Sequence, residues 1–118
     1  MLLFSWIAFE ASVWAEDSCQ GNLDLVSPCF SMRGRLAGYQ GNPTWRIWWV
    51  GTKRILGVTA RVPVPADIAK ILDAPEFDPD RSAIYADFLV CPLTRRAPEG
   101  MQYVCIEGAK NLRLGRRE

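Results

Sequence analysis

Apolar and polar residues alternate over three successive stretches in the first half of the chain. In residues 29–39 one face is apolar or glycine and the other is polar. The apolar face consists of Phe30, Met32, Gly34 and Leu36. A repeat of two residues is typical of a half-buried strand. Similar stretches at 44–50 and 53–59 are separated only by a Gly-Thr turn, so we predict a meander of three strands.

The second stretch is rich in tryptophan. Trp45, Ile47 and Trp49 fall on one face, whereas Arg46 and Trp48 fall on the other. Because successive side chains of a strand point to opposite sides, we expect the apolar trio to face the interior. Arg46 and Trp48 should then lie on the outer surface.

The apolar repeat changes after residue 64. Ile68, Ile71 and Leu72 follow the i, i+3, i+4 spacing of a helix, Pro65 occupies a favourable first position, and Pro75 ends the segment. We therefore predict one short helix of about ten residues.

Alternation returns in the last third of the chain. Residues 84–93 and 101–107 are expected strands, and residues 111–114 extend the second one past a bulge at Gly108. The order is three strands, a helix and two strands. That order predicts a mainly β fold, a five-stranded OB-like Greek-key barrel with one short helix between strands 3 and 4.

The N-terminal residues 1–15 resemble a signal peptide, possessing a short apolar run and a Val13-Trp14-Ala15 cleavage motif before Glu16. The run is too short to span a bilayer. No basic residue precedes it, which suggests a signal peptide truncated at its N-terminus; the alternative is an N-terminal core helix. We expect residues 16–118 to form a single periplasmic or secreted domain.

Four cysteines, Cys19, Cys29, Cys91 and Cys105, lie in this expected mature domain. An even number in a small exported chain predicts disulfides, and the absence of CxxC pairs disfavours a zinc or redox-active site. Strands of equal length on each side of the turn near residues 95–100 place Cys91 opposite Cys105. We predict that these two pair, which leaves Cys19 to pair with Cys29.

Five segments resemble a family of small, uncharacterised exported proteins of proteobacteria. The resemblance covers nearly all of residues 29–114, and it implies no particular activity. The matching segments are CFSMRGRL, YQGNPTWRIW, GTKRILGV, ADFLVCPLT and VCIEGAKNL.

Composition disfavours catalysis. The chain has no histidine, so it lacks the commonest general base, the usual partner of a serine or cysteine nucleophile, and the commonest metal ligand. The formal net charge is only +1, and it indicates no general attraction to nucleic acid or membranes. We expect a non-enzymatic domain without cofactor or metal.

Arginine and tryptophan cluster on the first three expected strands. OB folds bind oligonucleotides and oligosaccharides over strands 2 and 3 with aromatic and cationic side chains. Alternatively, Trp45 and Trp49 fill the barrel and Trp48 forms a structural cation–π pair with a neighbouring arginine. The candidate ligand-binding residues are Arg33, Arg35, Arg46, Trp48 and Arg54.

These residues suggest a binding module for a small anionic or saccharide ligand or for an envelope protein. The alternative is a single-stranded nucleic-acid-binding domain that uses the same face. A small enzyme is the third and weakest hypothesis.

Acidic residues gather between residues 73 and 87 and suggest calcium or carboxylate chemistry. They match no EF-hand pattern, so a solvated loop is favoured. Asp87 lies inside an expected strand, where it can pair with an arginine of the first strand. The ending from Arg113 to Glu118 is interpreted as a frayed basic tail.

Overall fold

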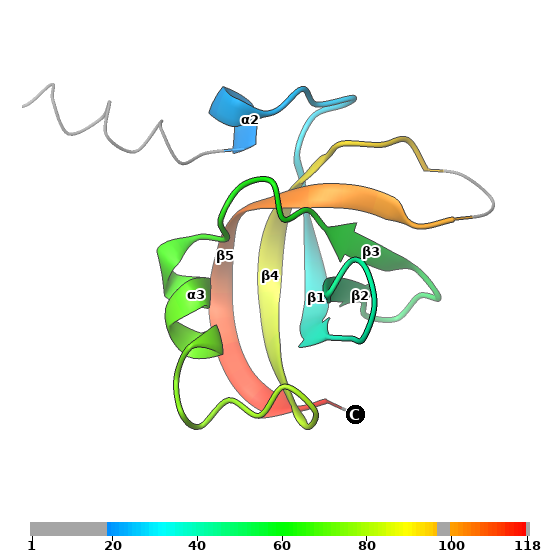
Figure 1. Ribbon diagram of the computed structural model, residues 1–118. Helices are drawn as coiled ribbons and strands as arrows, with labels where there is room; N and C mark the ends of the chain where they lie inside the picture. The colour runs from blue at the N-terminus through cyan, green and yellow to red at the C-terminus, as the bar shows by residue number, and fades with distance from the viewer. Residues whose placement is uncertain (1–18, 97–99, 118) are drawn as a thin grey trace, which may run out of the picture.

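A computed structural model describes residues 19–96 and 100–117 (Figure 1). The expected signal peptide lies outside the described residues. The elements are α2 (Cys19–Asn22), β1 (Phe30–Gly38), β2 (Trp45–Trp49), β3 (Ile55–Val58), α3 (Ala66–Leu72), β4 (Ser82–Pro92) and β5 (Gln102–Arg116). The structure is mainly β, as the alternating pattern predicts.

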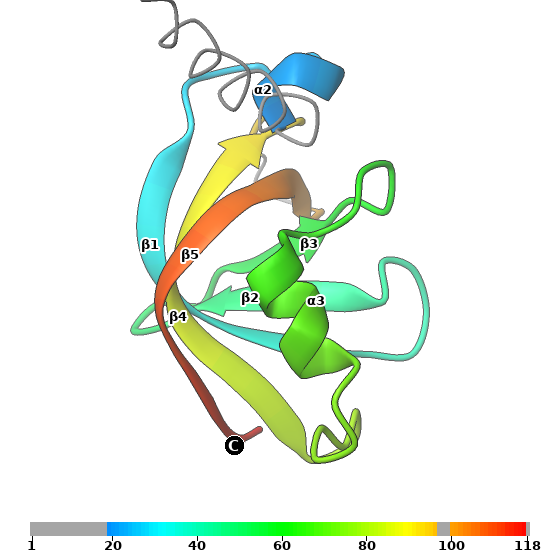
Figure 2. The ribbon, with the colours of Figure 1, turned by 90° about the vertical axis from the view of Figure 1, so that its left-hand side faces the viewer.

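The five strands form one sheet whose pairings close into a ring in the order β1-β2-β3-β5-β4. β1 pairs with both β2 and β4, and every pairing is antiparallel except that between β3 and β5. Figure 2 shows the strands wrapping around a common interior. A closed ring satisfies the edge hydrogen bonds that short strands would otherwise expose.

The interior contains the apolar faces that alternation predicts. Leu36 lies opposite both Ile47 and Ile84 in the strand registers, and all three side chains are fully buried. α3 covers the interior on the side seen in Figure 2, where Ile68 is fully buried. Trp45 and Trp49 are partly buried and pack against this core.

Two irregularities bend β5. Val90 pairs with Ile106 and Leu89 pairs with Gly108, so Glu107 is an extra residue at the bulge expected near Gly108. A second register shift lies close to Asn111, whose φ of 56° is in the left-handed region. The bent strand reaches β3 with its first residues and follows β4 along most of its length (Figure 1).

The predicted cysteine pairing was wrong, although the predicted strand register is correct. Cys91 lies opposite Cys105, but the disulfides join Cys19 to Cys105 and Cys29 to Cys91. The β1–β4 register ends with Phe30 opposite Val90, so Cys29 lies next to Cys91 on the following row. Cys91 therefore lies between Cys29, next to β1, and Cys105, on β5. Its disulfide is with Cys29.

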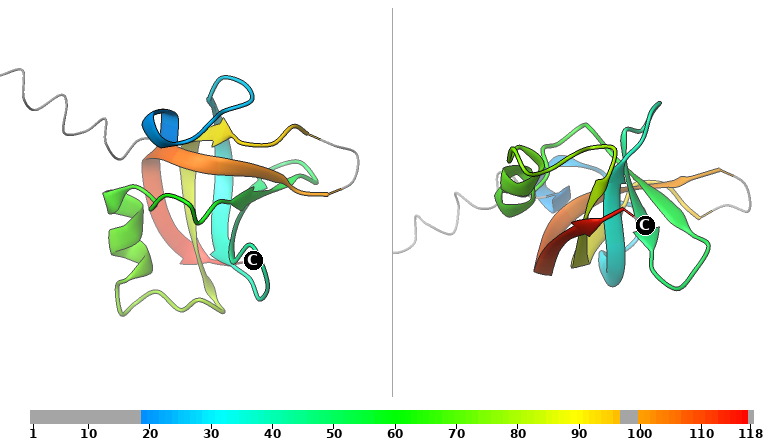
Figure 3. Two further views of the ribbon diagram at one scale, coloured as in Figure 1. Left: turned by 45° about the horizontal axis from the view of Figure 1, so that its top comes forward. Right: turned by 90° about the horizontal axis from the view of Figure 1, so that it is seen from below.

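Cys105 forms the second disulfide, with Cys19 in α2. Figure 3 (left) shows α2 beside the same ends of β4 and β5. The sulfurs are buried with partly buried apolar neighbours, which include Leu23, Val62 and Leu93. The two disulfides indicate an oxidising compartment. Within residues 19–96 and 100–117, no helix has the length and hydrophobicity needed to cross a bilayer.

Candidate anion-binding face

The outer face of β1 and β2 presents the arginines and the tryptophan that alternation placed there. Arg35 lies opposite Trp48, and Ala37 lies opposite Arg46, while Ile47 between them is buried. This register confirms that Arg46 and Trp48 share the face opposite the apolar trio.

Guanidinium groups cover the aromatic rings of this face. The guanidinium carbon of Arg35 lies 4.9 Å from the centroid of the Trp48 ring. Arg35 is also opposite Tyr85 of β4, which is opposite Arg113 of β5, and the guanidinium of Arg113 lies 5.4 Å from the Tyr85 ring. Aromatic and cationic side chains thus alternate in one row across four strands. The structural cation–π pair considered for Trp48 is present.

Tyr39, directly after β1, is contacted by two guanidinium groups. Those of Arg46 and Arg117 lie 4.7 Å and 4.6 Å from its ring centroid. Arg46 also donates from Nε to the carbonyl of Pro43 at 3.0 Å, and Arg117 donates from Nη1 to the carbonyl of Pro79 at 2.9 Å. These contacts hold both cations in defined positions.

Arg33 is already paired. Its Nη1 lies 3.3 Å from Oδ1 of Asp87, the ion pair with a strand arginine that the sequence predicts. Asp87 Oδ2 also accepts a hydrogen bond of 2.7 Å from Asn111. The Asn111 hydrogen bond, together with Arg33, lowers the pKa of Asp87 despite some desolvation. Arg33 therefore contributes less positive field to the face than its neighbours do.

Arg54 belongs to a different part of the surface. Its guanidinium lies 4.7 Å from the Trp49 ring and donates to Oε1 of Gln102 at 2.6 Å. It lines a cavity of about 500 Å³ together with Lys53 and Arg96. Burial, followed by repulsion from Arg96, lowers the pKa of Arg54. The structure does not bring Arg54 together with Arg35 and Arg46 around one cavity.

A second cavity, of about 550 Å³, does include Arg35. Its lining residues are Arg35, Tyr39, Asp80, Arg81, Arg116 and Arg117. The interpretation of the C-terminal arginines as a frayed tail was wrong, because Arg113 and Arg116 are residues of β5. Ser82 pairs with Arg116, and this pairing brings the end of the chain beside Arg81. The only sequence signal was the density of arginines from residue 113 onward.

A third cavity, of about 770 Å³, is mainly apolar. Its walls come from residues 42–45, the connection 58–64 and parts of α3, β5 and the segment after β4. Among the residues that the structure describes, Arg61 is its single cationic lining residue. This cavity lacks the charge that marks the other two.

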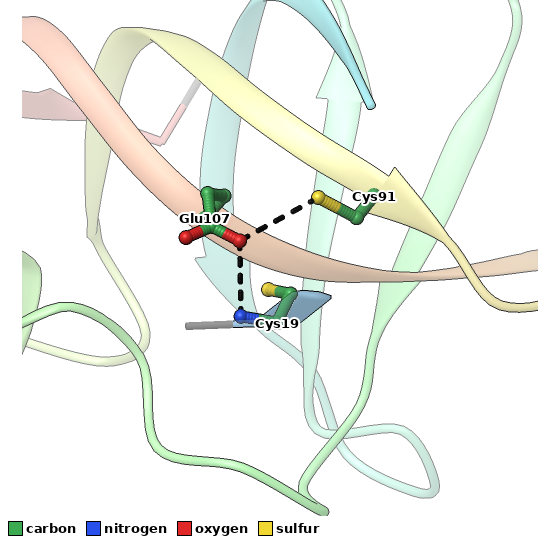
Figure 4. Close-up of side chains that lie close together, drawn as sticks. All are labelled: Cys19, Cys91 and Glu107. Carbon is green, nitrogen blue, oxygen red and sulfur yellow. Dashed lines mark hydrogen bonds between the residues drawn. The ribbon is translucent and has the colours of Figure 1, made fainter. Parts of the chain in front are cut away.

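Figure 4 shows one further cluster, in which Cys19, Cys91 and Glu107 converge. Oε1 of Glu107 accepts a hydrogen bond of 2.9 Å from the backbone N–H of Cys19 and lies 3.8 Å from Sγ of Cys91. Both cysteines are in disulfides, so neither offers the thiolate that a metal ion would bind. In this oxidised form the carboxylate acts as a hydrogen-bond acceptor for α2.

No protein-family model, curated protein or solved structure matches the chain. Its function is therefore inferred from the geometry of these sites.

Proposed function

We propose that this chain is an exported, non-catalytic OB-fold domain that binds an anionic ligand on its arginine–aromatic face. The face consists of Arg35, Tyr39, Arg46, Trp48, Tyr85, Arg113 and Arg117. The ring of five strands, with α3 between the third and fourth, supports the OB assignment. The two disulfides support export.

The observation that carries the proposal is an excess of fixed, unpaired cations. The guanidinium groups of Arg35, Arg46, Arg113 and Arg117 each lie over a ring of this face. Among the residues that the structure describes, the one ion pair joins Arg33 to Asp87. A guanidinium with its plane against a ring still presents N–H groups at its edge, and these suit carboxylate, sulfate or phosphate oxygens.

The covered rings favour an anion over a stacked nucleobase. Binding of single strands relies on bases stacking on exposed aromatic faces, whereas Trp48, Tyr39 and Tyr85 each already contact a guanidinium. Trp48 also uses its indole N–H, which donates to the carbonyl of Thr52 at 2.7 Å. A nucleic acid on this face would bind mainly through its phosphates.

The absence of histidine supports a non-catalytic role, since it removes the commonest proton-transfer group. The carboxylate of Asp78 has a structural role. Asp78 Oδ1 accepts a hydrogen bond from the backbone N–H of Asp80 at 3.0 Å, and the backbone N–H of Asp78 donates to the hydroxyl oxygen of Ser82. These hydrogen bonds order the turn between residues 78 and 82.

The proposal is tested by calorimetric titration of the disulfide-bonded protein with a sulfated oligosaccharide, its unsulfated counterpart and oligothymidylate. We expect the sulfated sugar to bind and the neutral sugar not to bind. Arg46→Gln and Arg113→Gln should each weaken binding about tenfold, the effect of one charged hydrogen bond. Lys70→Gln, an equal loss of charge at an exposed position of α3, should change the affinity less than twofold.

Two results would contradict this assignment. Equal affinity for the neutral sugar would show that the arginines are not the recognition elements. Tight oligothymidylate binding that persists at high salt would favour base stacking and the nucleic-acid hypothesis, because phosphate contacts weaken steeply as salt rises.

A further inference from the structure

The cavity at the C-terminal end of β5 combines an unusual amount of positive charge with fixed geometry. We infer that it binds a dianionic tetrahedral oxyanion of the phosphate-monoester class, an inference that rests on the proposed anion-binding function. In Figure 1 this end of β5 lies beside the start of β4, below the other elements.

The charge of the lining is strongly one-sided. Arg35, Arg81, Arg116 and Arg117 face a cavity in which Asp80 is the one acidic lining residue among those that the structure describes. None of the four arginines has a carboxylate within 4.0 Å among residues 19–96 and 100–117. Clustered guanidinium groups repel one another, and a bound dianion offsets more of that repulsion than a monoanion does.

Main-chain hydrogen bonds hold the backbone around the cavity, in addition to the bond from the Arg117 guanidinium to Pro79. The N–H of Arg117 donates to the carbonyl of Arg81 at 2.8 Å, and the carbonyl of Arg116 accepts the Tyr85 hydroxyl proton at 2.8 Å. Arg81 N–H donates to the carbonyl of Asp78 at 3.0 Å. Two segments distant in the sequence are thus joined before any ligand arrives, and this lowers the entropic cost of binding.

Arg35 supplies the most specific observation. Its Nε is buried and has no hydrogen-bond partner within the described residues, although its guanidinium lies over the Trp48 ring. Buried N–H groups nearly always have an acceptor. An oxyanion in the adjoining cavity would bring acceptor oxygens to the same guanidinium group.

Size and composition favour a phosphate ester over a simple carboxylate or a nucleobase. A cavity of about 550 Å³ has room for an organic substituent beside the anionic head. Tyr39, the aromatic lining residue, already contacts Arg46 and Arg117 and is poorly placed to stack on a base. Asp80 provides an acceptor for a hydroxyl group of the substituent.

The experiment uses calorimetric titration of the full, disulfide-bonded chain with inorganic phosphate, glycerol phosphate and acetate. We expect phosphate and its ester to bind and acetate to bind at least tenfold more weakly. Arg81→Gln and Arg116→Gln should each weaken phosphate binding about tenfold or more. Lys110→Gln removes the same charge from an exposed position of β5 outside both the cavity lining and the arginine–aromatic face, and it should change phosphate affinity less than threefold.

The pH dependence provides a second readout. The second pKa of a phosphate monoester is about 6, so affinity for glycerol phosphate should fall as pH drops through that value. Affinity for a sulfate ester should stay constant over the same range, and melting curves confirm that each variant is folded.

The outcomes separate the pocket from the face. If Lys110→Gln weakens phosphate binding as much as Arg81→Gln, the loss reflects the net charge of the protein and the pocket is refuted. If the sulfated sugar binds through Arg46 and Arg113 while phosphate does not bind, the pocket is refuted and the proposed function stands. If no anion binds, both fail.

Discussion

The two ends of β1 and β4 differ in what holds them together. At the sulfur end, defined by the two disulfides and α2, covalent bonds and buried apolar contacts dominate. The arginine end is defined by Arg35, Arg81, Arg116 and Arg117. There, main-chain hydrogen bonds join the strands, the Arg117 guanidinium donates to a backbone carbonyl, and those of Arg35 and Arg117 lie over rings. None of the four has an acidic partner among the described residues.

This difference indicates a division of roles along the same strands. Like charges held close together destabilise a fold unless a ligand neutralises them. Cross-links at the far end stabilise the folded state by restricting the unfolded chain. We therefore expect substitutions at the sulfur end to change stability and substitutions at the arginine end to change binding.

Loss of a disulfide should have the largest effect. The bridges close loops with sequence separations of 62 and 86 residues, and the chain-entropy model assigns about 4 kcal/mol to loops of this length. The double variants Cys29→Ala/Cys91→Ala and Cys19→Ala/Cys105→Ala should each lose about that much free energy of unfolding, measured by urea titration. By comparison, Arg81→Gln should change stability by less than about 0.5 kcal/mol.

Peptide mapping of the unreduced wild-type protein provides the control. We expect two cross-linked peptides, one with Cys19 and Cys105 and one with Cys29 and Cys91. A peptide that links Cys91 to Cys105 would contradict the arrangement at the sulfur end.

The two faces of β2 provide a sharper and smaller contrast. Ile47 is fully buried, so Ile47→Ala should destabilise the fold by about 3 kcal/mol through lost burial and a cavity. Trp48→Ala removes a half-exposed ring that contacts Arg35 and a hydrogen bond to Thr52, and it should cost about 1 kcal/mol. Equal losses in thermal melts would place Trp48 in the core and refute the outer face.

The smallest expected effect concerns Asp87. Its pKa in the folded protein is below the ordinary value of 3.8, so its contribution to stability is present above that pH and disappears as pH falls through the lower folded value. Asp87→Asn should therefore melt below wild type at pH 7 and converge with it in strong acid. Asp24→Asn, at an exposed site, should follow wild type throughout. If the melting temperatures of Asp87→Asn and wild type differed by the same amount at all pH values, the ion pair with Arg33 would not be the cause of the difference.

Much of the fold was predictable because strand alternation is a local property. The inward orientation of Leu36 and Ile47 follows from the alternation of apolar and polar residues along their own strands. The position of Cys91 opposite Cys105 follows from the equal strand lengths on either side of the connection between β4 and β5. Such features need only the chain within about fifteen residues.

The sequence by itself determined the mainly β character of the fold with five strands, the inner and outer faces of β2, and the presence of disulfides. Only the tertiary structure decided the cysteine partners and the arginine cavity. Both depend on strand pairings between distant segments: β1 with β4 brings Cys29 to Cys91, and β4 with β5 brings Arg116 to Arg81. Alternation states which side a residue faces, but it does not state which strand lies beside it, because that choice is made by packing of the whole interior.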